Sequence, residues 1–371
     1  MKRRNLVVPV PGEIQWVTED LPDVPEGGLL LETVATGLSA GTELTFVKGD
    51  HPGLGRTHDS ELGLFRDSAA APSYPVTRLG YMEVARVARS RSAAFAEGSL
   101  VASAYGHATA HVSDPVREHV VPLPDDLDPI LGVYVAHLGP ICANGLLHAA
   151  AEAVGPPVRG LGDGVAGRRV LVTGAGLIGL LTALMAREHG AEEVAVVDGD
   201  PRRRAVAEAL GMLALDETDD PALTLKTRWR HGPADHGADV AFQCRGRPHA
   251  LATALRALRP QGAVVDLAFY TDGAAEVRLG EEFHHNGLSV RCAQIGRTPR
   301  GTSGHWDRAR LSAETIRVLT SCGQEVRDHL VTDVVALEEA PRLMLEVARH
   351  ERHVLSAIFT ADDTSQAQAS L

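Results

Sequence analysis

The stretch that decides the fold runs from Gly167 to Asp198 and reads GRRVLVTGAGLIGLLTALMAREHGAEEVAVVD. Its short apolar, β-branched run at Val170–Thr173 predicts a buried parallel strand. A glycine-rich turn follows, and then an Ala- and Leu-rich helix is predicted over Leu180–His189, where Gly190 ends it. A second apolar strand ends on Asp198. The order strand, turn, helix, strand indicates the first βαβ unit of a parallel sheet.

The turn carries the glycine spacing of a dinucleotide site. Gly174, Gly176 and Gly179 stand in G-x-G-x-x-G order. The first glycine allows a tight turn, the second lets a pyrophosphate approach the backbone, and the third lets the helix pack on the strand. The turn also contains Leu177 and Ile178, and the N–H groups at the start of the helix that follows face the phosphates. We therefore expect these five residues to bind a dinucleotide.

Asp198 indicates which dinucleotide is bound. A carboxylate about 20 residues beyond such a turn takes the adenosine ribose hydroxyls and repels a 2′-phosphate, which favours NAD over NADP. Arg202, Arg203 and Arg204 follow closely and leave an alternative open, because they could grip that phosphate. They could equally form the solvated first turn of the next helix. We expect NAD as the cofactor, with Arg203 beside its ribose.

Length, charge and cysteine usage narrow the class of protein. At 371 residues the chain fits two domains better than one. A net charge of −12 argues against nucleic acid or an anionic membrane surface as a partner. No apolar run approaches the roughly 18 residues of a membrane helix. We see no secretory signal and no C-x-x-C pair among the 4 cysteines, so we expect a reduced, cytoplasmic protein.

The strand and helix signals divide the chain into two kinds of sequence. Residues 1–148 are punctuated by proline and read as mainly antiparallel strands, with a long surface loop at 48–73. Residues 149–297 alternate strands and helices, as in a parallel sheet. Residues 298–371 are expected to return to the first domain, with a frayed end at 361–371. The predicted fold class is α/β, a doubly wound parallel sheet inserted in a β-rich domain.

Along essentially its whole length, the sequence resembles the medium-chain dehydrogenase/reductase superfamily. The resemblance rests on Gly41-Thr42-Glu43, on Gly80-Tyr81, on the central glycine fingerprint and on the closing αβ elements. It implies a GroES-like catalytic domain, a Rossmann domain inserted in it, and an oxidoreductase that acts on a small-molecule substrate. It also implies a homodimer or homotetramer joined through the last Rossmann strand, which maps to Leu288–Ile295.

The sequence departs from this superfamily where its zinc alcohol dehydrogenases bind metal. Ala40 stands at the place of the first cysteine ligand, and Tyr81 and Met82 replace the His and Glu of the second motif. Gly139-Pro140 gives the third position no donor, and three missing ligands leave no tetrahedral site. The combination looks like a zinc-free branch that includes the bacteriochlorophyllide dehydrogenases, so no metal is expected. The histidines that we considered show no convincing ligand spacing: His51, His58, His107, His111 and His137.

Without a metal, a reacting oxygen needs hydrogen-bond donors or an acid/base group. Thr42 matches the family's relay hydroxyl, although it could also cap a helix. Tyr81 should point into the cleft, where a phenol beside the positive nicotinamide could titrate below its usual pKa of about 10. The alternative for Tyr81 is a filler of the vacated metal cavity. Glu43 would orient the relay or bond to an Arg, and His137 is either a catalytic candidate or a core residue.

Further cofactor contacts are expected where strands of the parallel sheet end, because open α/β sheets bind ligands at the carboxyl edge. The residues expected to give backbone contacts to nicotinamide there are Cys244, Arg245, Ala293 and Gln294. The sequence thus predicts an NAD-dependent, zinc-independent dehydrogenase of a secondary alcohol or ketone, such as a biosynthetic intermediate. Three alternatives stay open: an NADPH-dependent enone or quinone reductase, a redox epimerase with tightly held NAD, and a non-catalytic dinucleotide-binding protein.

Overall fold

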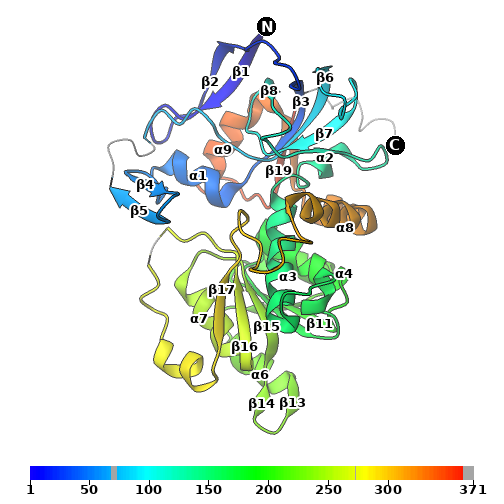
Figure 1. Ribbon diagram of the computed structural model, residues 1–371. Coiled ribbons are helices and arrows are strands. Elements are labelled where there is room, and N and C mark those ends of the chain that lie inside the picture. Colours follow the sequence, from blue (N-terminus) through cyan, green and yellow to red (C-terminus); the bar gives the residue numbers. More distant parts are fainter. Residues whose placement is uncertain (68–72, 272, 362–371) are drawn as a thin grey trace. The chain divides into compact units, whose positions relative to one another are not determined.

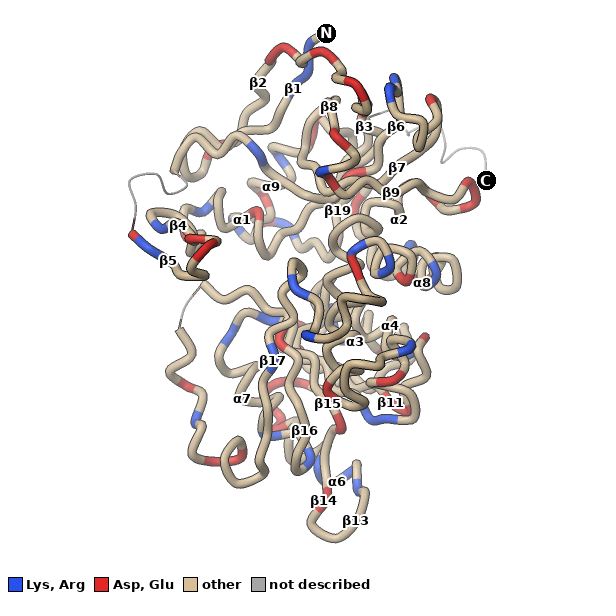
Figure 2. Tube along the Cα trace, in the orientation of Figure 1, with Lys and Arg blue, Asp and Glu red and all other residues tan. Residues whose placement is uncertain are grey.

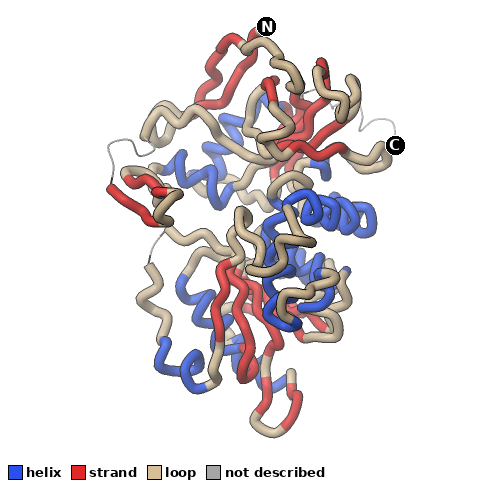
Figure 3. The backbone as a smooth tube through the Cα atoms, in the orientation of Figure 1, coloured by secondary structure: helices blue, strands red, loops and turns tan. Residues whose placement is uncertain are grey.

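The computed structural model describes residues 1–67, 73–271 and 273–361, so the predicted fraying beyond Ala361 lies outside the described residues. The chain forms two compact units, whose elements are labelled in Figure 1 and coloured by type in Figure 3. The first unit comprises residues 1–137 and 331–371, and the second comprises residues 138–330.

This division differs from the expected boundaries at 148 and 298. Helix α3 (Leu138–Val154) packs on α4 (Leu177–Glu188), and α8 (Arg308–His329) packs on α3. All three helices lie in the second unit, because the apolar side chains of α3 and α8 are buried there. Sequence periodicity predicts such helices but does not say which sheet they cover.

The first unit is built on a seven-stranded sheet with the order β18-β19-β3-β6-β7-β9, in which β8 also pairs with β3. Its strands are β3 (Leu29–Gly37), β6 (Glu83–Ser90), β7 (Leu100–Ser103), β8 (Ala110–Ser113), β9 (Val120–Pro122), β18 (Asp333–Ala336) and β19 (Ala357–Thr360). Phe359 of β19 pairs antiparallel with Thr36 of β3, so late and early residues share one sheet. The strands β8 and β9 are separated by a turn at Asp114.

The remaining elements of the first unit are short. They are β1 (Lys2–Val7), β2 (Gln15–Asp20), α1 (Ala40–Lys48), β4 (Arg56–Asp59), β5 (Leu64–Asp67), α2 (Pro129–Gly132), η3 (Leu337–Glu339) and α9 (Ala340–Ala348). The hairpin of β4 and β5 occupies part of the expected loop 48–73. Helix α1 packs on α9 through an apolar cluster that includes Leu44, Val47, Leu343 and Phe359. This packing fixes the helix that carries Thr42 and Glu43.

The second unit contains a six-stranded parallel sheet with the order β12-β11-β10-β15-β16-β17. Numbered by their order in the sequence, these strands are arranged 3-2-1-4-5-6, as in dinucleotide-binding folds. Successive strands are added on one side of β10 up to β12 and then on its other side from β15 onward. The strands are β10 (Arg169–Thr173), β11 (Glu193–Asp198), β12 (Leu213–Asp216), β15 (Ala238–Gln243), β16 (Leu258–Asp266) and β17 (Ser289–Cys292). The predicted fold class, a Rossmann sheet inserted in a β-rich domain, is confirmed.

Helices cover both faces of this parallel sheet. Leu171 packs on one face with Leu225 of α6 (Pro221–Arg228) and Leu255 of α7 (Pro248–Ala257). Its neighbour Val172 points to the opposite face, where its Cγ1 lies beside Gly179 of α4. Consecutive residues of β10 therefore pack into the apolar cores on the two faces of the sheet, which explains why the strand is mainly apolar. The other elements of this unit are η1 (Leu161–Gly164), α5 (Pro201–Ala209), β13 (Arg230–Gly232), β14 (Asp235–His236) and η2 (Leu279–Phe283).

Charged residues of both signs are interspersed along the traces of the two units in Figure 2. No helix among the described residues has the length and apolar character needed to cross a membrane.

Candidate functional site

The glycine-rich turn has the conformation that its spacing predicts. Gly174 has φ +98°, a backbone conformation that residues other than glycine rarely adopt. A methyl group at Gly179 would overlap the carbonyl oxygen of Gly174, so this glycine lets α4 start close to the strand. At Gly176 a methyl group would meet nothing, which leaves open space in front of the turn. Leu177 and Ile178 follow as the half-buried first turn of α4.

Asp198 ends β11 beside this turn and is tied to it. Its Oδ2 accepts a hydrogen bond from the Ala175 N–H at 2.8 Å, and its Oδ1 accepts one from the Asp200 N–H at 2.8 Å. The side chain is buried, with 3% of the residue exposed. Each oxygen keeps a second lone pair. Asp198 therefore supports the turn and can still accept a hydrogen bond from a ribose hydroxyl.

Beside Asp198 lies a pocket of about 640 Å³ that Arg203 also lines. Of the three consecutive arginines, Arg202 pairs with Asp200 at 2.9 Å, and Arg204 pairs with Asp216 at 2.6 Å. Arg203 makes no ion pair with the described residues, and its Nε is buried without a hydrogen-bond partner. The structure thus separates the three arginines and leaves Arg203, the one expected beside the ribose, available to a ligand.

Cys244 and Arg245 follow β15 at the same edge of the sheet. The Cys244 N–H donates to the Thr173 carbonyl at 2.9 Å, which extends the pairing of β10 with β15. Burial raises the pKa of the Cys244 thiol well above its ordinary value, so the thiol stays protonated. Arg245 extends its guanidinium into the pocket beside Asp198, where it pairs with Glu217. Only backbone contacts were expected of Arg245.

Ala293 and Gln294 follow β17, and a residue that the sequence analysis missed holds them. Buried Asn144 of α3 donates from Nδ2 to the carbonyls of Ala293 at 3.4 Å, Gln294 at 3.2 Å and Arg297 at 3.2 Å. The Ala293 N–H donates to the carbonyl of Asp266 at 2.9 Å. The only sequence signal was one Asn within an Ala- and Leu-rich helical run.

The predicted catalytic residues of the first unit gather around Tyr81. Its hydroxyl forms a hydrogen bond with Oγ of Ser39, and its ring centroid lies 4.6 Å from that of His137. The hydroxyl of Thr42 also interacts with the phenol. We call Ser39, Thr42, Tyr81 and His137 the Tyr81 cluster. Ser39, which the sequence analysis did not select, is the N-cap residue of α1, so the capping role considered for Thr42 is not observed.

A buried pair stands behind this cluster. Glu43 Oε2 lies 2.8 Å from Nε2 of His107, and both side chains are buried. Glu43 Oε1 accepts the Ser39 N–H at 2.7 Å, and His107 Nδ1 lies 2.7 Å from Oγ1 of Thr36. The alternative that Glu43 bonds to an arginine was wrong, because its carboxylate contacts His107, which lies 64 positions further along the chain. We call this arrangement the Glu43–His107 pair.

The donor atoms of the Glu43–His107 pair are not available to a catalytic zinc ion. Both ring nitrogens of His107 and both carboxylate oxygens of Glu43 already have partners within the protein. His111 lies against buried Glu83 at 3.5 Å and stacks on Tyr105. Within the described ranges, no group of three or more His, Cys, Asp or Glu side chains is placed to hold a metal ion. We derive no chemical step through a metal.

The pKa of Tyr81 moves in the direction opposite to the prediction. Burial raises this pKa above its ordinary value, and the negative charge of Glu43 raises it further. Hydrogen bonds with Ser39 and Thr42 favour the ionised form but do not outweigh burial. Sequence reasoning considered only a positive neighbour, whereas the first unit itself surrounds the phenol with groups that keep it neutral. Tyr81 is therefore a hydrogen-bond donor at neutral pH.

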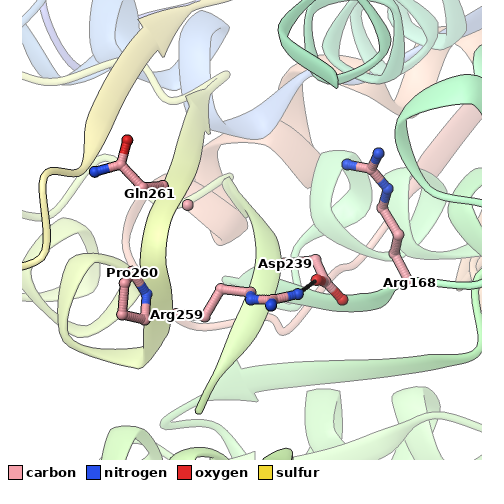
Figure 4. A pocket seen from close by; sticks show the side chains of 6 residues that line it. Arg168, Asp239, Arg259, Pro260 and Gln261 are labelled. Atoms are coloured by element: carbon pink, nitrogen blue, oxygen red, sulfur yellow. Dashed lines mark hydrogen bonds and ion pairs between the residues drawn. The ribbon is translucent and has the colours of Figure 1, made fainter. Parts of the chain in front are cut away.

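A second pocket in the Rossmann unit lies away from these residues. Its lining comes from the start of β15 and from the irregular part of β16, and it includes Arg168, Asp239, Arg259 and Gln261. Figure 4 shows Arg259 paired with Asp239, while Arg168 and Gln261 point away from that pair. This is the amino edge of the parallel sheet, and ligands of such sheets bind at the carboxyl edge. We therefore do not assign the cofactor to this pocket.

Comparisons with known proteins match part of the second unit to a family and match the chain to several relatives. Residues 178–307 match the family described as zinc-binding dehydrogenase. The (R,R)-butanediol dehydrogenase of Bacillus subtilis strain 168 is 29% identical over 176 residues, which are 47% of this chain and 45% of that relative. The chain thus spans about half the length of the curated relatives that it matches.

Solved structures share the fold over nearly the whole chain. The alcohol dehydrogenase TADH from Thermus sp. ATN1 has a TM-score of 0.74 at 18% identity and covers 97% of this chain and 100% of its own. A protein from Sinorhizobium meliloti 1021, solved bound to NADP, has a TM-score of 0.73 at 19% identity and covers 97% and 99%. Residues 178–307 are therefore similar to the zinc-binding dehydrogenase family, and the chain as a whole shares the fold of a solved alcohol dehydrogenase.

Proposed function

We propose that this protein is an NAD-dependent oxidoreductase that transfers hydride between nicotinamide and a secondary alcohol or ketone of a small molecule, without zinc. The family match of residues 178–307 and the relatives, which are dehydrogenases, support the oxidoreductase class. The observation that carries the zinc-free mechanism is the hydrogen bond between Tyr81 and Ser39. The hydrogen bond supports a half-buried, neutral donor at the position where the resemblance expects a metal ligand.

The residues of each unit have separate tasks in this proposal. Gly174, Gly176 and Gly179 would hold the pyrophosphate, and Asp198 would accept from the ribose. Bound NAD supplies or accepts the hydride. In ketone reduction, the Tyr81 hydroxyl donates its proton to the substrate oxygen, and that hydroxyl regains a proton through Oγ of Ser39. In alcohol oxidation, the same proton moves in the opposite direction.

The other residues of the first unit position this relay. Glu43 holds the Ser39 N–H, and His107 holds Glu43, so the start of α1 is fixed relative to the sheet. His137 packs beside the Tyr81 ring and limits its movement. Thr42 offers a second hydroxyl to the phenol. The arrangement is preorganised, which is how hydrogen-bond donors stabilise a developing negative charge on oxygen.

The preference for NAD rests on the carboxylate at the end of β11. A 2′-phosphate would come close to Asp198, and two negative groups at short range repel each other. The Sinorhizobium meliloti structure holds NADP, but its 19% identity makes it a guide to the fold alone. We therefore keep NAD as the proposed cofactor.

The proposal is tested with secondary diols, beginning with 2,3-butanediol, because a butanediol dehydrogenase is among the relatives. Activity with NAD should persist after exhaustive treatment with a strong chelator, and Tyr81→Phe should lower kcat by about 10²- to 10⁴-fold, the usual contribution of a general acid. Tyr105→Phe is the matched control, because Tyr105 is a hydrogen-bonded tyrosine outside the Tyr81 cluster. If the chelator removed a metal ion and abolished activity, and zinc alone restored that activity, the mechanism would be refuted.

We also propose that the protein is a cytoplasmic homodimer joined along β17. This strand pairs with β16 on one side and is the last strand of the six-stranded sheet. Arg291 and Val290 on it are exposed, and an exposed edge strand invites pairing with a second chain. Val290→Lys should shift the mass measured by light scattering from dimer to monomer. A monomeric mass for the unaltered protein would refute this assembly.

A further inference from the structure

The pocket beside Asp198 contains a second carboxylate, which the sequence did not single out. Glu217 follows β12, and its Oε2 pairs with Nη1 of Arg245 and lies 3.3 Å from Nε2 of His249. The Glu217 side chain is 25% exposed, whereas Asp198 is 3% exposed. Glu217 is therefore the carboxylate that a ligand in this pocket meets more directly.

Gly199 allows Glu217 to reach this position. A methyl group at Gly199 would overlap Oε1 of Glu217, so the carboxylate lies against the backbone immediately after Asp198. This is the place where a dinucleotide fold positions the adenosine ribose. Gly199 and Glu217 directly follow the neighbouring strands β11 and β12, which pair in parallel at Asp198 and Asp216.

The charges of the pocket balance almost completely within the protein. Arg202 is paired with Asp200, and Arg245 is paired with Glu217. Arg203 is the one arginine lining this pocket that makes no ion pair with the described residues. A 2′-phosphate carries between one and two negative charges at neutral pH. It would meet one unpaired guanidinium and two carboxylates, those of Asp198 and Glu217.

We propose that Glu217 determines the choice of NAD over NADP by holding Arg245 and repelling a 2′-phosphate. This inference rests on the proposed function, because it assigns the pocket to the adenosine ribose. Removing the negative charge of Glu217 would leave Arg245 beside Arg203 as a second cation without a counter-ion. The pocket then acquires the cation pair that a 2′-phosphate needs, while Asp198 still accepts from a ribose hydroxyl.

The test is fluorescence titration of NADH and NADPH against the full chain at low ionic strength, where charge effects are least screened. Glu217→Gln should bind NADPH about 10- to 100-fold more tightly, the range of one hydrogen bond to a charged group, with little change for NADH. Adding Arg245→Met to this variant should remove the gain. Gly199→Ala, which displaces Glu217 without removing its charge, should shift the ratio in the same direction but less.

Glu192→Gln is the matched control. It removes the same charge from an exposed carboxylate just before β11, at the amino edge of the sheet, and should leave both affinities unchanged. If the unaltered protein binds NADH and Glu217→Gln does not change the NADPH to NADH ratio, the role of Glu217 is refuted and the proposed function stands. If the unaltered protein binds neither nucleotide, the proposed function fails, and this inference fails with it.

Discussion

Replacing His107 by Leu should destabilise the first unit strongly, because it leaves the Glu43 carboxylate without its partner. Glu43 is 2% exposed and His107 is 1% exposed, so neither group can be solvated in exchange. Leaving a buried carboxylate without its partner costs about 3–5 kcal/mol of the free energy of unfolding. At roughly 2–4 °C per kcal/mol for a domain of this size, the melting temperature should fall by about 6–20 °C.

Glu43→Gln is the contrasting change. The glutamine oxygen can still accept the Ser39 N–H, and its amide can face His107, so the expected loss is about 1 kcal/mol, the value of one hydrogen bond. Urea unfolding followed by circular dichroism measures both variants. NADH binding measured on the same samples reports the second unit and should not change in either.

The double variant His107→Leu with Glu43→Met isolates the interaction. Two apolar side chains leave no unpaired charge, so the double variant should be more stable than His107→Leu alone, with a coupling of about 0.5–3 kcal/mol. A loss below about 1 kcal/mol for His107→Leu would refute the reasoning, because it would mean that Glu43 does not need a partner in this environment.

Three further outcomes are expected. The pKa of Tyr81 is raised by burial, so its basic form is scarce at neutral pH; kcat for alcohol oxidation should rise as the pH increases through the alkaline range, and this rise should be absent in Tyr81→Phe. Asn144→Leu leaves three backbone carbonyls without their donor and should lower the free energy of unfolding by about 1–3 kcal/mol; unchanged urea midpoints would contradict this. Gly179→Val should abolish NADH binding measured by fluorescence, because its side chain would overlap the Gly174 carbonyl oxygen, whereas Gly63→Val in the exposed β4–β5 turn should bind NADH normally.

The sequence was most informative where the local structure is determined by residues that lie close together in the sequence. The turn at Gly174–Gly179 and the strand ending at Asp198 were predicted because local apolar pattern and glycine spacing determine them together. The sequence analysis did not use the Asp114-Pro115 dipeptide, which is typical of turns and separates β8 from β9 in the structure.

Contacts between distant parts of the chain could not be predicted in this way. Thr42, Glu43 and Tyr81 were selected by their resemblance to family positions, but nothing local connects Glu43 with His107 or Tyr81 with Ser39. Ser39 follows β3 and Tyr81 precedes β6, and these two strands are hydrogen-bonded neighbours whose paired residues lie 47 to 61 positions apart. Asn144 was missed for the same reason, since its partners follow β17.

The direction of the pKa shift at Tyr81 links the buried pair to the proposed chemistry. A zinc ion stabilises negative charge on oxygen without giving up a proton, whereas a neutral phenol must donate its proton to do so. Such a donor works only if it is protonated when the substrate arrives, and burial together with the Glu43 charge ensures that. The carboxylate that fixes Ser39 also raises the pKa of the phenol, so one buried group positions the relay and keeps it protonated. It follows that an arginine partner for Glu43, which the sequence analysis considered, would neutralise this charge and weaken the donor state of Tyr81, whereas a histidine holds the carboxylate in place without a permanent positive charge.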